Sequence, residues 1–236
     1  MRARPQKVRH SPQLSLNLLG EFMVASFVRR LSILRDAKFP KDYIGPRYDP
    51  AQKAAARYLS DMSRDAGRLK GDIDAQLVKA AKSKWFDDRQ KLCEQALRCV
   101  LALEESLKLD GLVVALGCNP AHRLEIGGVT VIVMPDLLVQ GRGPSGPVLG
   151  ALKFRYVKTK PITDKWAAYS ATLLHRFVEV QPGDPGGVAD RRRCNLVDVF
   201  AGRIHEAPAN FKELRKEVDA ACWYIGEIWP KVGMNA

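Results

Sequence analysis

The chain has 236 residues and a formal net charge of +12, from 38 Lys and Arg against 26 Asp and Glu. Its composition, 46% hydrophobic and 27% charged, is that of an ordinary globular protein and excludes wholesale disorder. No apolar run approaches the length needed to cross a bilayer, so we expect no contact with a membrane. The basic balance instead favours a polyanionic partner.

The positive charge is concentrated in the first third of the chain. Residues 1–70 hold 15 Lys and Arg against 6 Asp and Glu, a net charge of +9, which leaves +3 for residues 71–236. Such asymmetry indicates that one part faces a polyanion, although a basic surface kept for solubility gives the same numbers. No signal-peptide segment follows the basic start, and the five cysteines lack zinc-binding spacing, so we expect a reducing, cytoplasmic setting.

The predicted elements begin after a loose basic arm over residues 1–13. Apolar residues at helical spacing predict four helices, at Leu14–Asp36, Asp49–Arg64, Asp72–Lys82 and from Asp87 or Asp88 to Lys108. The second follows a proline-rich loop and begins with Asp49-Pro50, a cap followed by proline in the first turn. We take residues 1–85 as a basic helical N-terminal region.

The spacing changes after Gly111, where apolar and β-branched residues predict strands. Strands are expected at 111–117, on both sides of Gly127-Gly128 within 122–141, at 148–157 and at 194–202. Residues 141–147 form a glycine-rich turn between two of them, and two more helices are expected, from Thr163 to about Val178 and from about Pro208 onward. Residues 86–236 therefore form an α/β (α+β) core.

Pro135-Asp136 at the end of one strand and Ala151-Leu152-Lys153 on the next carry a family resemblance. Over about residues 89–203 the chain resembles the restriction-endonuclease-like nucleases, the PD-(D/E)xK superfamily. This resemblance implies a central mixed sheet flanked by helices and a Mg²⁺-dependent phosphodiesterase site. Asp136 would hold the metal, and Lys153 would assist the attacking water or contact phosphate. Oxygen ligands place Mg²⁺ beside the scissile phosphate, where a nearby cation stabilises the developing charge.

Ala151 stands where that superfamily has its second metal-binding acid. Glu125 on the preceding strand is the candidate replacement ligand, with Glu94, Glu104 and Glu105 on the preceding helix as alternatives. The resemblance therefore implies a weak or inactive site.

The exonuclease branch of the superfamily places a glutamine four residues before a tyrosine on the next helix. Lys165 and Tyr169 keep this spacing but not the glutamine. Asp136 and Lys153 also have a purely structural interpretation, as a strand-end turn residue and an outward lysine. An acid inside an apolar strand, Asp198, needs a partner, and we expect an arginine, such as one of Arg191–Arg193.

Two groups of basic residues are candidate nucleic-acid contacts. Arg29 and Arg30 lie near the end of the first predicted helix. Arg155 alternates with Lys153 on the strand at 148–157, and Lys158 and Lys165 follow that strand. Such residues can track a phosphate backbone, with nearby aromatic side chains stacking on bases. A solvated edge strand protected by lysines is the alternative.

Two hypotheses follow from the sequence. The first is a nucleic-acid-associated protein, for DNA or RNA, with a weak or inactive nuclease-like core. The second is a non-enzymatic interaction or assembly protein, in which the N-terminal helices bind a protein partner and the core is a scaffold.

Overall fold

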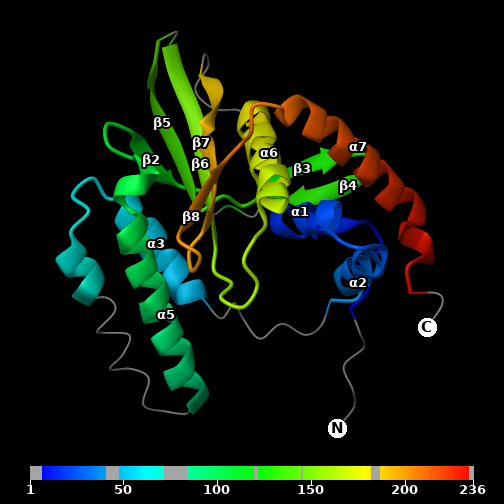
Figure 1. Cartoon of the computed structure of the whole chain (residues 1–236), viewed down its shortest axis with the longest axis horizontal. Coiled ribbons are helices and arrows are strands. Elements are labelled where there is room, and N and C mark those ends of the chain that lie inside the picture. The colour runs from blue at the N-terminus through cyan, green and yellow to red at the C-terminus, as the bar shows by residue number, and fades with distance from the viewer. Residues whose placement is uncertain are drawn as a thin grey trace.

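The computed structural model describes residues 7–40, 48–71, 84–117, 119, 122–144, 146–181 and 187–233, with the side chains of 84–87 left aside. At its centre lies a five-stranded sheet (Figure 1), made of β2 (Val113–Leu116), β5 (Leu137–Gly143), β6 (Gly146–Arg155), β7 (Val188–Asp198) and β8 (Arg203–Glu206) in that order. Neighbouring strands are antiparallel except β6 and β7, which are parallel and are connected through helix α6 (Asp164–Val180). The predicted mixed α/β class is confirmed.

A second, three-stranded sheet has the order β1-β4-β3, from β1 (Gln13–Ser15), β4 (Val129–Ile132) and β3 (Arg123–Ile126). Gly127 and Gly128 form the turn between β3 and β4, as predicted, and their φ angles of +52° and +78° are those that a tight hairpin turn requires. Strand β1 runs parallel to β4, which ties the start of the chain to its middle.

Helices cover both faces of the central sheet (Figure 1). One face carries α1 (Leu16–Val24), α2 (Phe27–Lys38), α6, α7 (Phe211–Ile228) and the small sheet, and the other carries α3 (Asp49–Ser60) and α5 (Lys84–Leu103). Successive residues of β6 point to opposite faces, so that Ala151 joins the first hydrophobic cluster while Leu152 and Phe154 join the second. Burial on both faces explains why residues 148–152 of this strand are all apolar or glycine.

The helical N-terminal region packs onto the α/β core. Leu16 and Leu19 share the first hydrophobic cluster with Leu173 of α6, and Leu59 of α3 shares the second with Leu97 of α5. The end of α2 also contacts the segment that follows α7. Lys38 donates hydrogen bonds to the carbonyl groups of Trp229, Pro230 and Val232, around the short 3₁₀ helix η2 (Trp229–Lys231).

The single helix predicted over Leu14–Asp36 is wrong. Ser15 and Ser26 each have extended backbone and a side-chain oxygen that accepts from an N–H three residues later, which starts α1 and then α2. Arg30 stabilises the boundary between the two helices, because its guanidinium donates to the carbonyls of Phe22 and Met23 at the end of α1.

Other element boundaries differ from the prediction. α3 ends at Ser60, four residues earlier than expected, and α5 gives way to a 3₁₀ turn, η1 (Glu105–Leu107), before Lys108. Strand β7 begins at Val188, so Arg191–Arg193 lie within it, and β8 was not predicted. α6 begins after the predicted cap, Thr163. The predicted helix Asp72–Lys82 lies outside the described residues.

Candidate functional site

Asp136 and Lys153, the two residues that the sequence motif singles out, lie together. Asp136 directly precedes β5, Lys153 lies on the neighbouring strand β6, and the lysine Nζ is 3.2 Å from Oδ2 of Asp136. The same ammonium donates to the carbonyl of Met134 at 2.6 Å. Met134 itself has a φ of +41°, a left-handed conformation uncommon for this residue type, in the turn that leads to Asp136.

The carboxylate of Asp136 is enclosed by protein donors. Its side chain has no exposed surface, and Oδ2 accepts the Phe154 N–H at 2.7 Å. Oδ1 accepts from the side-chain amide of Gln52 on α3. Sequence reasoning missed Gln52, because it lies on a helix 84 positions earlier in the chain. Asp136 therefore links β5, β6 and α3.

This arrangement does not fit a hydrated Mg²⁺ ion, which keeps several water ligands in an octahedral shell. Asp136 has no solvent-facing side, so a hydrated cation would have to displace Gln52 or Lys153. Ala151, at the position of the second acid, is buried among apolar residues. Within the described ranges, no three His, Cys, Asp or Glu side chains gather as a metal site.

The proposed replacement acids have other roles. Glu125 lies on β3 of the small sheet, where it is exposed and accepts from the Thr130 hydroxyl at 2.9 Å. Glu104 accepts from the Tyr58 hydroxyl at 2.6 Å, and burial together with this bond raises the pKa of Tyr58 to about 12. Glu94 bonds Arg98 one helical turn away.

Tyr169 of the exonuclease-like spacing serves to pack α6 against α7. Its hydroxyl donates to Glu217, and burial together with this bond raises the pKa of Tyr169 to about 12. Lys165, four residues earlier, is exposed at the start of α6.

Asp198 and Arg155 form a buried ion pair at the far ends of β7 and β6. They are register partners 3.3 Å apart, with side-chain exposures of 0% and 5%. Asp198 also accepts the Ile162 N–H, and Arg155 donates to the Lys160 carbonyl. The expected ion pair of Asp198 with an arginine is present, but the arginine is Arg155 rather than one of Arg191–Arg193. Arg155, a candidate nucleic-acid contact, is directed inward rather than toward solvent.

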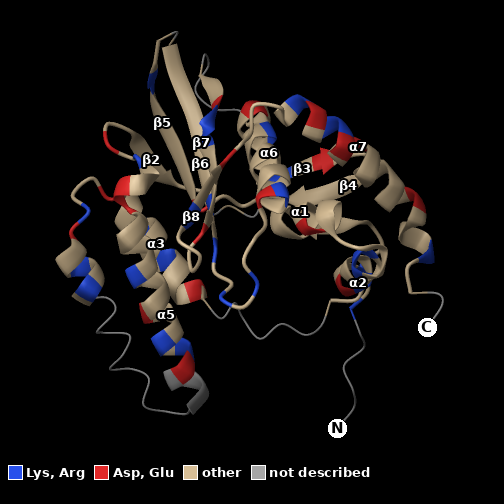
Figure 2. Cartoon of the chain, viewed as in Figure 1, with Lys and Arg blue, Asp and Glu red and all other residues tan. Residues whose placement is uncertain are grey.

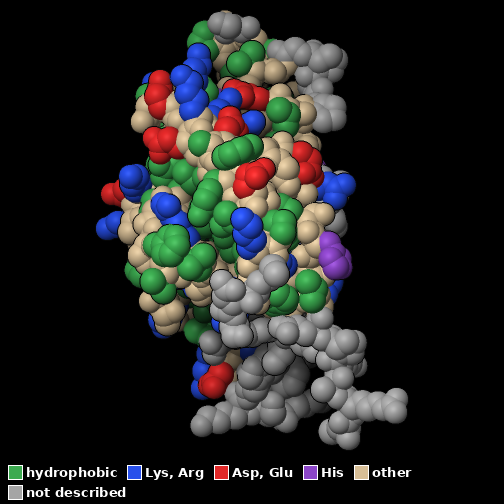
Figure 3. All heavy atoms as spheres, turned by 90° about the vertical axis from the view of Figure 1, so that its right-hand side faces the viewer, with side chains coloured by type: hydrophobic (Ala, Val, Ile, Leu, Met, Phe, Trp, Pro, Cys, Tyr) green, Lys and Arg blue, Asp and Glu red, His purple; other side chains and the backbone are tan. Residues whose placement is uncertain are grey.

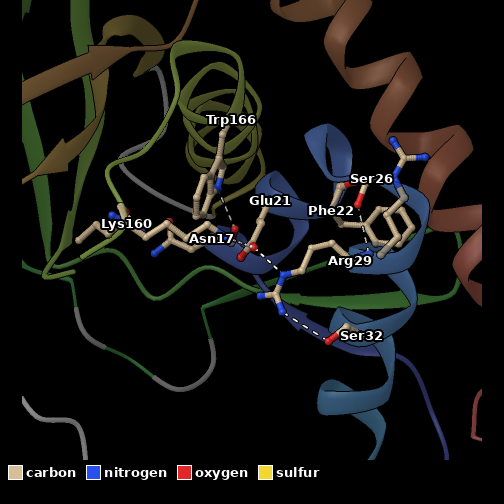
Figure 4. Close-up of polar contacts among 10 residues, drawn as sticks. Asn17, Glu21, Phe22, Ser26, Arg29, Ser32, Lys160 and Trp166 are labelled. Carbon is tan, nitrogen blue, oxygen red and sulfur yellow. Dashed lines mark hydrogen bonds and ion pairs between the residues drawn. The ribbon is translucent and has the colours of Figure 1, made fainter. Parts of the chain in front are cut away.

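Glu21 of α1 forms ion pairs with Arg29 of α2 and with Lys160 of the loop after β6 (Figure 4). It is buried, accepts from Arg29 Nε at 2.9 Å and from Lys160 Nζ at 2.5 Å, and lies beside the Trp166 indole, which donates to the Asn17 carbonyl. Burial alone would raise the pKa of Glu21, but the hydrogen bonds from both cations outweigh it and lower the pKa. This contact fixes the loop after β6 against α1.

A cavity of about 680 Å³ lies on the α5 face of the central sheet, where α5 has ended. Leu103 and Leu107 form one wall, and Val139, Leu152 and Asn195 of β5, β6 and β7 form the floor. No motif predicted it. Two features of the sequence could have indicated the cavity: Gly150, and the basic triplet Arg191–Arg193, of which Arg192 and Arg193 line it.

Among the residues that the structure describes, no helix combines the length and apolar character needed to cross a bilayer. Comparison of the sequence with protein-family models and with curated proteins gave no significant match. Geometry and residue chemistry therefore carry the functional argument.

Proposed function

We propose that the chain binds nucleic acid through a nuclease-like core that does not cleave it. The observation that carries the proposal is the Asp136–Lys153 pair, which the resemblance expects on neighbouring strands and which is found there at 3.2 Å, but buried and hydrogen-bonded. In the central sheet β2, β5 and β6 are antiparallel neighbours, β7 is parallel to β6, and helices cover both faces, in keeping with the mixed sheet flanked by helices that the resemblance implies.

The proposed contact surface is narrower than the sequence indicated. Lys158 and Lys165 are exposed at the loop between β6 and α6 and at the start of α6, and Figure 2 shows basic residues on this loop. Arg29 keeps 42% of its side chain exposed while it pairs with Glu21, so it can join them. Arg30 closes the end of α1 and Arg155 is buried, so neither is part of the proposed surface.

Binding is tested by fluorescence anisotropy with labelled single- and double-stranded DNA and RNA over a range of salt concentrations. We expect affinity to fall steeply with salt, and the K158A/K165A double variant to reduce the slope of log affinity against log salt by about 2. K212A/K216A on α7 removes the same charge from two other exposed lysines and serves as the matched control. No binding at low salt would overturn the proposal.

Cleavage is tested separately, by incubating the same nucleic acids with Mg²⁺ or Mn²⁺. We expect intact substrates, because Asp136 is enclosed and Ala151 supplies no ligand. Cleavage by the natural chain that disappears in Asp136→Ala would show a catalytic site and reverse the non-cleaving part of the proposal.

A specific observation favours a second candidate function, assembly with protein. Phe27, Val28 and Leu31 of α2 are exposed by 67%, 77% and 44%, and Trp223 of α7 by 64%. Figure 3 faces the side that carries α2 and α7 and shows hydrophobic side chains at the surface between charged ones. Sedimentation equilibrium over a range of concentrations tests self-association, which Val28→Asp should weaken if α2 forms the contact.

We place this activity in a reducing cytoplasm. Cys93, Cys99, Cys194 and Cys222 are free thiols, and burial raises the pKa of Cys194 and of Cys222 to about 12. Thiols with such pKa values stay protonated and unreactive, as structural cysteines of reducing compartments do.

A further inference from the structure

The cavity at Asn195 is shaped by an irregularity in strand β7. Leu149 of β6 pairs with Ala189, but Ala151 pairs with Cys194, so four residues of β7, numbers 190–193, lie opposite Gly150 alone. A side chain at Gly150 would place its Cβ 2.4 Å from Arg193, so glycine is required for the bulge. Bulges commonly redirect side chains next to functional sites, and this one carries the basic triplet to the cavity.

Two buried polar atoms at this cavity have no hydrogen-bond partner. Asn195 is only 7% exposed, and its Oδ1 atom is buried without a donor from any described residue. Arg193 Nε is likewise buried without a hydrogen-bond acceptor, although it forms an ion pair with Oδ2 of Asp190 at 3.6 Å. Such atoms are costly to bury, and other examples lie elsewhere in the described structure, but these two line the same cavity and together point to a missing ligand there.

The two atoms define what such a ligand must present. Arg193 and Asn195 both line the cavity, so their side chains leave β7 on the same face of the sheet. The Arg193 N–H needs an acceptor, and the Asn195 carbonyl needs a donor. Adjacent donors and acceptors on one flat edge are characteristic of nucleobases, and an asparagine amide is a common reader of that pattern.

The remaining lining combines apolar residues, cations and three carboxylates, of which Asp110 pairs with Arg64 and Asp190 with Arg193. Val139 and Leu152 form an apolar floor facing Leu107, which accepts an aromatic ring. Lys108 and Arg192 are exposed lining residues and belong to no ion pair among the described residues, so they are available for a phosphate. The volume of about 680 Å³ lies within the usual range of small-molecule sites.

We propose that this cavity binds a nucleotide, with the edge of its base on Asn195 and Arg193 and its phosphate near Lys108 and Arg192. The nucleotide is either free or one unit of a single strand whose base is turned out of its stack, as in proteins that read extruded bases. In the second case the inference rests on the proposed nucleic-acid binding and identifies the site that contacts the base.

The test is calorimetric titration of the full chain with AMP, GMP, CMP and UMP, and with inorganic phosphate alone. We expect at least one nucleotide to bind at millimolar concentrations or below, and phosphate to bind at least about tenfold more weakly. Asn195→Leu should weaken nucleotide binding at least about fivefold, because one buried hydrogen bond is lost. Arg192→Ala, at an exposed position that the fold does not need, should weaken it about threefold. Arg123→Ala, an exposed strand arginine of the small sheet, is the matched control and should bind normally.

The outcomes separate this inference from the proposed function. Absence of nucleotide binding, equal binding of phosphate alone, or full affinity in both cavity variants would overturn the inference, even if oligonucleotides bind through Lys158 and Lys165. Conversely, nucleotide binding that Asn195→Leu weakens, without any binding of oligonucleotides, supports a free-nucleotide site and contradicts the proposed function.

Discussion

The Asp136 pair and the Asn195 cavity use the same central strands but differ in how their polar atoms are satisfied. Asp136 is a buried charge held by a lysine, a backbone N–H and an amide, whereas Asn195 and Arg193 leave buried atoms without hydrogen-bond partners. The comparison shows that the type of residue does not by itself identify a site. When the charges of a motif are all paired within the protein, the motif stabilises the fold. Polar atoms that line a cavity without a hydrogen-bond partner are better indicators of a ligand than such a motif.

The largest effect on stability is expected at the enclosed Asp136–Lys153 pair. Asp136→Asn leaves the Lys153 ammonium, with 14% of its side chain exposed, facing a neutral amide, and should lower the free energy of unfolding by about 3–5 kcal/mol in urea titrations. Asp36→Asn on the exposed side of α2 is the control and should stay within about 0.5 kcal/mol. Unchanged or higher stability in Asp136→Asn would mark a carboxylate kept for function, contrary to our interpretation.

The bulge beside the cavity should show the next largest effect. Gly150→Ala brings a Cβ against Arg193 and should lower the free energy of unfolding by about 1–3 kcal/mol, since the backbone of β7 must shift. Gly71→Ala, which has no heavy atom within 4 Å of the added Cβ, is the matched substitution. Equal stability of the two variants would show that the bulge moves freely and does not position Arg193.

At the Asn195 cavity, substitution should raise stability rather than lower it. Asn195→Leu replaces an unsatisfied buried amide with an apolar side chain and should raise the free energy of unfolding by about 1 kcal/mol. Thermal unfolding without ligand measures this gain. A loss of stability instead would mean that the Asn195 amide is satisfied within the fold, and the contrast between the two regions would disappear.

The smallest effect is expected for Arg192→Ala. Its side chain is exposed at the cavity, so the free energy of unfolding should change by less than about 0.5 kcal/mol while nucleotide affinity falls. Urea titration and calorimetry on the same preparation compare the two quantities. A stability loss as large as that of Gly150→Ala would assign Arg192 to the fold.

The sequence was sufficient to predict the meeting of Asp136 and Lys153, because both lie on neighbouring strands joined by a short turn. It was not sufficient to predict their enclosure, because Gln52 comes from a helix far away in the chain. Arg155 was placed at the surface from its alternation with Lys153, but its register partner is Asp198, and the two charges are buried together. Pairing between distant strands is decided by tertiary packing, which local spacing does not report.

The boundary between α1 and α2 could not be predicted from the spacing of apolar residues. Apolar residues continue from α1 into α2 across Ala25-Ser26, and only the capping serine marks the break. The bulge at residues 190–193 was hidden for a similar reason, because its one requirement on β6 is a single glycine. A single small residue can therefore end a helix or permit a bulge, although it hardly changes the apolar pattern of the sequence.

The parallel pairing of β1 with β4 has a consequence for the order of events during synthesis. Gln13 pairs with Thr130, so β1 has no partner until residue 130 has been made. The carbonyl of Arg9 accepts from the Trp229 indole, which lies 220 positions later in the sequence. Closing these long loops carries an entropic cost before any contact repays it. The segment that holds Arg9 and β1 is thus made long before its native partners, and we expect it to reach these contacts late in folding.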